Sequence, residues 1–236
     1  MDNPLSAHLR PTASRPLLGL TILVVEDSRY CCDAMRLLCL RSGARIRRAD
    51  CLKSARRHLQ VYRPSVVIVD LGLPDGSGAE LISELAIACP RVDVLIGTSG
   101  DSFAEEIALA AGADGFLAKP VSSLSAFQSI ILQALPPERR PNGPRSVMDD
   151  PILPDPLAYR DDMAHAADVL DDNADERAMR YVTQFLTGVA RSAGDRVLQA
   201  AAEELEEARR AGGPVQPNLA RVAALVQDRL TDRLAI

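Results

Sequence analysis

The stretch SVVIVDLGLPDGSG, residues 65–78, combines a strand-like apolar run with a polar residue and a loop. It begins with an apolar, largely β-branched run, which is typical of a strand buried on both faces. The run ends at Asp70, and the Gly and Pro residues that follow indicate a loop. In a parallel α/β sheet, a residue in this position lies at the carboxyl end of a strand, where such proteins form their sites.

Similar apolar runs occur on both sides of this one, at residues 21–25, 92–97 and 115–118, and residues 44–49 (ARIRRA) are also predicted to form a strand. Segments with helical spacing of apolar residues separate the runs, at residues 29–42, 51–62, 76–89, 103–111 and 122–135. We expect Asp50 to cap the second of these helices, and Asp101 or Ser102 to cap the fourth. The alternation predicts an α/β domain over residues 19–135, with a parallel sheet covered by helices on both faces.

The composition fits a protein with a large aliphatic core, since 47% of the residues are hydrophobic and Trp is absent. No apolar run approaches the roughly 20 residues that a membrane span needs, and the polar N-terminus lacks the apolar region of a secretory signal. We therefore expect a cytoplasmic protein. None of the five cysteines forms a CxxC pair or has a His at metal-ligand spacing, so we favour buried packing over a redox or metal role.

The second half of the chain has a different pattern. We expect residues 1–18 to be a flexible tail and residues 136–156, with seven of the 16 prolines, to be an extended linker. Helical periodicity then continues to the end, and Gly212-Gly213 is a good helix C-cap. The sequence predicts an all-α antiparallel bundle over residues 157–236, with helices at residues 157–171, 175–193, 195–211 and 217–234.

Charge separates the two halves and bears on the kind of partner. Residues 136–236 carry 18 acidic and 13 basic side chains, whereas DNA-binding domains are normally basic, so DNA binding is disfavoured. A basic set in the first half is either a solvated face or a docking patch for an acidic partner, such as the chain's own tail. Its members are Arg45, Arg47, Arg48, Arg56 and Arg57.

Polar residues follow four of the predicted strands, at one edge of the sheet. Three crowded carboxylates would repel one another, and a hard divalent cation such as Mg²⁺ or Mn²⁺ would offset that repulsion. With a phosphoryl group on the central carboxylate, the cation, an ammonium and a hydroxyl could each stabilise one of its oxygens. The residues concerned are Glu26, Asp27, Asp70, Thr98 and Lys119.

Four segments resemble the signature segments of response-regulator receiver domains of two-component systems, the CheY-like family. They are VVEDS (24–28), IVDLGLPDGSG (68–78), GTSGD (97–101) and GADGFLAKPV (112–121). The resemblance covers residues 19–135 and implies a flavodoxin-like (βα)5 fold with strand order 2-1-3-4-5. It implies that Asp70 is the phosphorylated residue.

The resemblance also assigns the residues around Asp70. It implies that Asp27, Asp70 and the backbone carbonyl of Gly72 bind the divalent cation, with Glu26 acting through a water. It implies that Thr98 and Phe116 form a switch pair, and that Lys119 contacts the phosphoryl group and precedes a cis Pro120.

Residues 173–212 resemble, more faintly, the central hairpin of histidine phosphotransfer (Hpt) domains, with its AHxLKGxA core. Gln184 falls where the phosphorylated His belongs, Thr187 falls on the Lys, and Gly188 falls on the Gly. A Gln side chain has no nucleophilic nitrogen, so the resemblance implies a degenerate domain. His165 lies one helix earlier, off the motif. A lone helical His is more often a surface or packing residue than a phosphorylated one.

The sequence therefore predicts a response regulator that accepts phosphate from a histidine kinase or Hpt protein. We expect it to signal through a downstream protein partner or self-association, with no nucleic acid and no membrane partner. It would be no enzyme beyond catalysing its own phosphorylation and dephosphorylation. One alternative makes the tail an active phosphotransfer or phosphatase module, which needs a catalytic residue in residues 157–236. The third hypothesis is a DNA-binding regulator.

Overall fold

The computed structural model describes residues 11–101, 103–141, 151–171 and 175–231. A parallel sheet lies at the centre of the first region, with strand order β2-β1-β3-β6-β7. Counted along the chain without the small hairpin β4–β5, this is the order 2-1-3-4-5, so the predicted flavodoxin-like topology is confirmed. The strands are β1 (Thr21–Val25), β2 (Arg45–Ala49), β3 (Val66–Asp70), β6 (Val94–Ser99) and β7 (Gly115–Ala118).

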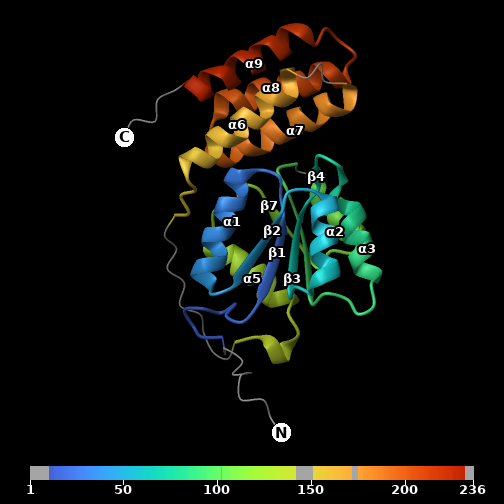
Figure 1. Cartoon of the computed structure of the whole chain (residues 1–236), viewed down its shortest axis with the longest axis vertical. Helices are drawn as coiled ribbons and strands as arrows, with labels where there is room; N and C mark the ends of the chain where they lie inside the picture. The colour runs from blue at the N-terminus through green and yellow to red at the C-terminus, as the bar shows by residue number, and fades with distance from the viewer. Residues whose placement is uncertain (1–10, 102, 142–150, 172–174, 232–236) are drawn as a thin grey trace.

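Helices cover both faces of this sheet (Figure 1). Along β1 and β3, successive side chains enter two different cores, one shared with α1 and α5 and one shared with α2, α3 and α4. This is why these strands are apolar at nearly every position instead of alternating. The helices are α1 (Arg29–Ser42), α2 (Leu52–Val61), α3 (Gly78–Ile87), α4 (Ala104–Ala110) and α5 (Leu124–Ala134).

A two-stranded antiparallel hairpin, β4 (Gly72–Leu73) and β5 (Gly76–Ser77), follows Asp70. The sequence did not predict it, because two-residue strands carry no periodic signal. The hairpin delays the start of α3 from the predicted residue 76 to Gly78.

The predicted helix caps differ from the observed ones. The N-cap of α2 is Cys51, not Asp50, and the carboxylate of Asp75 in the hairpin accepts from the next two backbone N–H groups. The N-cap of α4 is Phe103, which makes no side-chain cap bond, while Asp101 accepts from the Phe103 N–H just before the helix. Ser102 lies outside the described residues. At the start of α2, the Asp75 carboxylate, which is distant in the sequence, thus adds to the local Cys51 cap.

The first compact region extends beyond residues 19–135 on both sides. Leu17, expected in a flexible tail, is fully buried in the α1–α5 core, and its N–H donates to Ser42 O at 2.9 Å. In the predicted linker, Pro137–Arg139 form a short 3-10 helix, and Ile152 packs into the same core. Leu17 and Ile152, apolar residues in largely polar stretches of sequence, therefore anchor both segments to this core. Residues 1–10 and 142–150 lie outside the description.

Beyond residue 155 the described chain is helical. The helices pack around one apolar core, and their residue ranges are close to those predicted from the sequence. Asp175 and Asp195 cap α7 and α8, and Gly212 adopts φ +65° directly after the C-cap of α8. None of the described helices is long and apolar enough to cross a membrane. The elements are α6 (Pro156–Asp171), α7 (Glu176–Ala193), α8 (Arg196–Arg210) and α9 (Gln216–Thr231).

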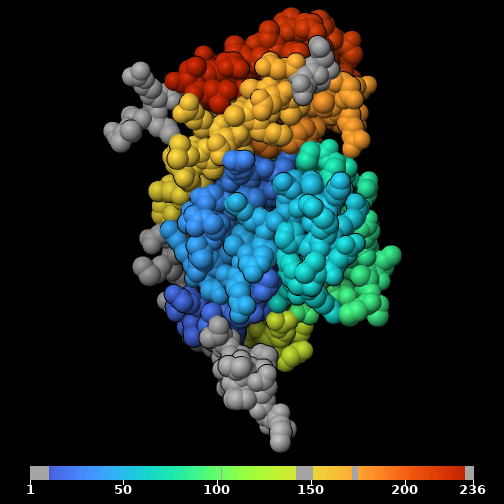
Figure 2. Space-filling view, in the orientation of Figure 1, coloured from blue at the N-terminus to red at the C-terminus, as the bar shows by residue number. Residues whose placement is uncertain are grey.

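These C-terminal helices lie across the end of the sheet at which the strands finish, with α8 and α9 farther away (Figure 1). Contacts join α1 to both α6 and α7, and join α7 to the β4 hairpin. In the space-filling view the two regions touch along this edge (Figure 2). The polar residues at the strand ends therefore face a second layer of protein.

Candidate functional site

The parallel sheet brings three carboxylates together. Glu26 and Asp27 follow β1, Asp70 ends β3, and one oxygen from each lies within 4.8 Å of the other two. Lys119 follows β7, and its Nζ lies 2.7 Å from both Asp70 Oδ2 and Glu26 Oε2. Glu26, Asp70 and Lys119 are each at most 9% exposed. The arrangement is a buried ionic cluster with one cation among three acids.

Burial and mutual repulsion act strongly on these groups. Burial raises the pKa of Glu26 well above its usual range, and the Lys119 charge only partly opposes this. Burial, with the charge of Asp70, also raises the pKa of Asp27 to about 7. Burial alone would lower the pKa of Lys119, but the nearby carboxylates hold it well above normal. The single positive charge of Lys119 therefore does not balance the three carboxyl groups of the cluster.

The cluster fits a hard divalent cation. Carboxylate oxygens are the ligands that Mg²⁺ and Mn²⁺ prefer, and a cation would supply the missing positive charge. Gly72 lies beside the cluster, where its N–H donates to Asp70 Oδ1 at 3.3 Å. Within the part of the chain that the structure describes, this is the one group of three or more His, Cys, Asp or Glu residues placed to hold a metal.

The predicted switch residues lie in the two strands next to Asp70. Thr98 pairs in register with Asp70, is fully buried, and donates its hydroxyl to Leu117 O at 2.7 Å. Phe116 is half-buried and packs against the core shared with α2 to α4. The Thr98 hydroxyl thus has a backbone partner and does not contact Asp70. The Lys119–Pro120 peptide bond is cis, as the resemblance implied.

A cavity of about 740 Å³ lies where the ionic cluster meets α7. Asp70 and Lys119 line it from one side, and Gln184 and Thr187 line it from the other. Since one water occupies roughly 30 Å³ of liquid volume, the cavity has room for a phosphoryl group together with several waters. The predicted degenerate phospho-His position therefore faces the predicted phosphorylation site within one molecule.

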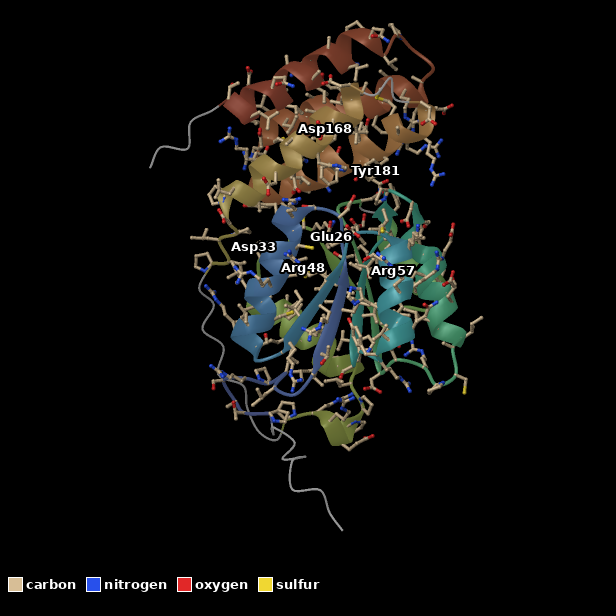
Figure 3. All side chains as sticks on the ribbon, viewed as in Figure 1. Glu26, Asp33, Arg48, Arg57, Asp168 and Tyr181 are labelled. Carbon is tan, nitrogen blue, oxygen red and sulfur yellow. The ribbon has the colours of Figure 1, made fainter. Side chains whose placement is uncertain are left out.

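Tyr181 of α7 makes a direct contact with the cluster that the sequence did not suggest. Its hydroxyl donates to Asp27 Oδ2 at 2.7 Å, and Figure 3 labels Tyr181 on the C-terminal helices and Glu26 at the end of the sheet below them. His165 Nε2 lies 2.9 Å from the same hydroxyl. When the Tyr181 proton is donated to Asp27, the His165 tautomer with a proton on Nε2 can donate to the Tyr181 oxygen. In the sequence, Tyr181 is simply one member of an apolar stripe.

Asp162 of α6 joins the two regions. Its carboxylate is buried and accepts from Ser28 Oγ and Arg29 N, both at 2.7 Å, and from Tyr30 N at 3.1 Å. These N–H groups belong to the first turn of α1, where a helix attracts negative charge. No sequence signal distinguishes this carboxylate from the other acids of the C-terminal half.

The cysteines and the basic set form no part of this site. All five cysteines are free, and burial raises the pKa of Cys31 and of Cys39 to about 12, which favours the inert thiol form. Of the basic set, Arg56 pairs with Glu84 of α3. Figure 3 places Arg48 and Arg57 below the C-terminal helices.

Residues 22–130 match the family described as the response regulator receiver domain. Among curated proteins, PhoP of Escherichia coli K12 is 32% identical over 100 residues, which are 42% of this chain and 45% of PhoP. KdpE of the same strain is 34% identical over 100 residues, 42% of this chain and 44% of KdpE. The probable regulator TcrX of Mycobacterium tuberculosis is 34% identical over 103 residues, 43% of this chain and 44% of TcrX. The match spans less than half of each relative.

Two solved structures are similar to about half of this chain. A response regulator from Chloroflexus aurantiacus has 23% identity and a TM-score of 0.46, over 49% of this chain and 96% of the other. CheY4 of Vibrio cholerae has 19% identity and a TM-score of 0.44, over 49% of this chain and 98% of the other. The family match ends at residue 130, so it does not assign the C-terminal helices.

Proposed function

Because residues 22–130 form a response regulator receiver domain, we propose that Asp70 accepts a phosphoryl group and that the C-terminal helices turn this event into a change of binding. The phosphodonor would be a histidine kinase or an Hpt protein, and the setting would be the cytoplasm. The observation that carries the proposal is the Lys119 ammonium, 2.7 Å from the Asp70 carboxylate, inside a buried acidic cluster. A charged pair in this position suits transfer of an anionic group.

The transfer would follow from the geometry of this edge. An Asp70 oxygen attacks the phosphorus of a phosphohistidine, the bond to the imidazole nitrogen breaks, and the imidazole leaves neutral after taking up a proton. Lys119, already beside Asp70, would bind a phosphoryl oxygen. Asp27, Asp70 and the Gly72 carbonyl would hold Mg²⁺ or Mn²⁺, with Glu26 acting through water. The bound cation supplies the positive charge that offsets the incoming phosphoryl charge.

The output would arise where α7 meets this edge. A phosphoryl group on Asp70 adds negative charge to the cavity that α7 covers, next to the Tyr181–Asp27 hydrogen bond. Rearrangement of Thr98 and Phe116, the proposed switch pair, would accompany it. We infer that the docked position of α6–α9 changes, which exposes or hides a surface for a downstream protein or a second copy of this chain.

We also propose that α6–α9 are an antiparallel bundle of the degenerate Hpt type. Gln184 is exposed in the middle of α7 and faces the receiver, which is the place that a phosphorylated His would need. The alternative of an active phosphotransfer module has little support in the described residues, because His165 uses Nε2 to contact Tyr181 and lies on α6. DNA binding, although PhoP and KdpE are named transcriptional regulatory proteins, remains disfavoured by the acidic C-terminal half.

The test is phosphorylation of the whole chain by acetyl phosphate with Mg²⁺, followed by intact mass. We expect one base-labile phosphoryl adduct that Asp70→Asn abolishes. Asp93→Asn is the matched control, because Asp93 precedes β6 at the opposite end of the sheet and pairs with Arg139. An adduct of equal yield in Asp70→Asn would exclude Asp70 as the acceptor.

A further inference from the structure

The carboxamide of Gln184 is an unusual polar group at this edge. It lines the cavity that also contains Asp70 and Lys119. Among the described residues, no group forms a hydrogen bond with it, although neighbouring Thr183 and Thr187 both donate to α7 backbone carbonyls. Its donor and acceptor are therefore available to whatever enters the cavity.

Glycines of the receiver make room for this part of α7. A Cβ atom built on Gly72 would lie 2.5 Å from Gln184 Nε2, which is closer than real Cβ contacts allow. A Cβ on Gly100 would lie 3.6 Å from the Cα of Gly188, one turn further along α7, which is an ordinary van der Waals contact, so only Gly72 is required here. The close approach of Gln184 therefore depends on the missing side chain two residues after Asp70.

The position of Gln184 suits a particular reaction. In an in-line displacement at phosphorus, the attacking oxygen approaches from the side opposite the leaving oxygen. For a phosphoryl group carried by Asp70 in this cavity, α7 forms the wall that faces Asp70, so an attacking water would lie on the α7 side. A neutral carboxamide can orient water beside a phosphoryl group without electrostatic repulsion, and a Gln has this role in some GTPases.

We propose that Gln184 is a catalytic residue that orients water for hydrolysis of the Asp70 aspartyl phosphate, so that α7 is a phosphatase element acting in cis. This inference rests on the proposed phosphorylation of Asp70. A bond forms between the water oxygen and phosphorus, and the bond between phosphorus and the Asp70 oxygen breaks. The products are the Asp70 carboxylate, which returns to Lys119, and inorganic phosphate. The water proton leaves with the phosphate or passes to solvent, and nothing is oxidised.

The test measures the lifetime of the phosphorylated protein. The whole chain is phosphorylated with acetyl phosphate and Mg²⁺, the donor is removed by desalting, and the decay of the adduct and release of phosphate are followed. We expect Gln184→Ala to slow the decay by at least about tenfold, because removal of one aligned polar group commonly has an effect of this size or more. Gln184→Asn keeps the amide and should give an intermediate rate.

Gln227→Ala is the matched control, because Gln227 is also an exposed helical glutamine but lies on α9. It should decay at the wild-type rate. Docking of the helices is checked separately by hydrogen exchange of the Arg29 and Tyr30 amides, which Asp162 binds and which Gln184→Ala should leave unchanged. Beryllium fluoride, an aspartyl-phosphate mimic, should shift the Gln184 side-chain amide resonances in the wild type and not in Asp70→Asn.

The outcomes separate this inference from the proposed function. If the wild-type chain forms no Asp70 adduct, the proposed function fails and this inference fails with it. If the adduct forms but decays equally fast in Gln184→Ala, only the catalytic role of Gln184 is overturned. Faster phosphorylation of Gln184→Ala with an unchanged decay would assign Gln184 to masking of the site, which also overturns the proposal.

Discussion

The receiver and α7 meet across the same cavity but contribute different chemistry to it. The receiver edge supplies charged groups, namely the acidic cluster with Lys119, which are suited to carry and stabilise a phosphoryl group. Two α7 residues that meet this edge are uncharged, since Tyr181 donates to Asp27 and Gln184 lies beside Gly72, whereas Arg180 and Arg191 of the same helix also line the cavity. Neutral donors and acceptors can approach a carboxylate cluster without repulsion. The comparison indicates that the receiver holds the reacting charges and the helices modulate them.

The two sides are also positioned in different ways. Strand register fixes the receiver residues, because Asp70 pairs with Thr98 inside a sheet that is buried on both faces. The α7 residues depend on docking of one region on another, and Asp162 is the most buried polar contact that joins them. The first side should therefore resist single substitutions at the interface, whereas the second should be sensitive to them.

The largest effect is expected for Asp162→Ala, which removes the helical side's anchor. The N–H groups of Arg29 and Tyr30, which are partly buried at the contact with α6, lose their acceptor, and each unsatisfied group costs roughly 1–3 kcal/mol. We expect docking to weaken by about 3 kcal/mol. Hydrogen exchange of these two amides should then accelerate by about a hundredfold.

Asp161→Ala is the control for that experiment. Asp161 pairs with Arg29 at 2.6 Å, but both side chains are at least half exposed, so we expect a change of at most about 1 kcal/mol. Equal acceleration in the two variants would show that docking does not depend on the buried carboxylate.

Within the helical region, Asp195→Asn should have the next largest effect. Asp195 caps α8 and accepts from the Tyr159 hydroxyl and from Arg229. Burial alone would raise its pKa, but these hydrogen bonds, with that of Leu198, lower it from 3.8 to about 2. Because the folded pKa is depressed, the stabilisation is complete above about pH 4 and is lost as the pH falls toward 2.

We expect Asp195→Asn to lower the free energy of unfolding by about 1–2 kcal/mol at pH 7, allowing for solvent screening. The difference from the wild type should shrink between pH 4 and pH 2. Urea unfolding followed by circular dichroism at several pH values measures this. A difference that stays constant over that range would rule out the charge of Asp195 as its source.

Tyr181→Phe tests the direct hydrogen bond between α7 and Asp27 of the acidic cluster. Loss of the hydroxyl should weaken docking by about 1 kcal/mol, the usual net value of a hydrogen bond. Asp27 is then free to bind a cation, so the affinity for Mn²⁺ should rise about threefold to tenfold, as measured by calorimetry. Tyr159→Phe, which loses a hydroxyl bonded to Asp195, should leave Mn²⁺ affinity unchanged. Weaker Mn²⁺ binding by Tyr181→Phe would contradict this account.

Gly72→Ala should have the smallest effect on stability. The added Cβ would meet the end of the flexible Gln184 side chain, which can move aside, so we expect less than about 1 kcal/mol. The displaced carboxamide should nevertheless lengthen the aspartyl-phosphate lifetime toward that of Gln184→Ala. The double variant should decay no more slowly than Gln184→Ala alone, because both changes remove one interaction. Multiplied effects would show that the two residues act independently.

Most of the receiver could be predicted because its signals are local. Apolar runs bounded by polar residues located the strands to within two residues, since a strand buried on both faces tolerates few polar side chains. The errors occurred where the signal was short or the partner distant. The β4–β5 hairpin has too few residues for periodicity, and Asp75 in that hairpin accepts from the first N–H groups of α2 in addition to the Cys51 cap.

The sequence by itself determined the receiver fold and the grouping of Glu26, Asp27, Asp70 and Lys119, because parallel strands bring their carboxyl ends to one edge. Only the tertiary structure decided what faces that edge. On an isolated helix the polar positions of Asp162 and Gln184 are equivalent to any solvated position, and Tyr181 is one member of the apolar stripe, since helical periodicity records which face packs inward and not what meets the outer face. Docking of α6 and α7 selects these three residues and places an amide in the cavity that Asp70 lines at the end of β3.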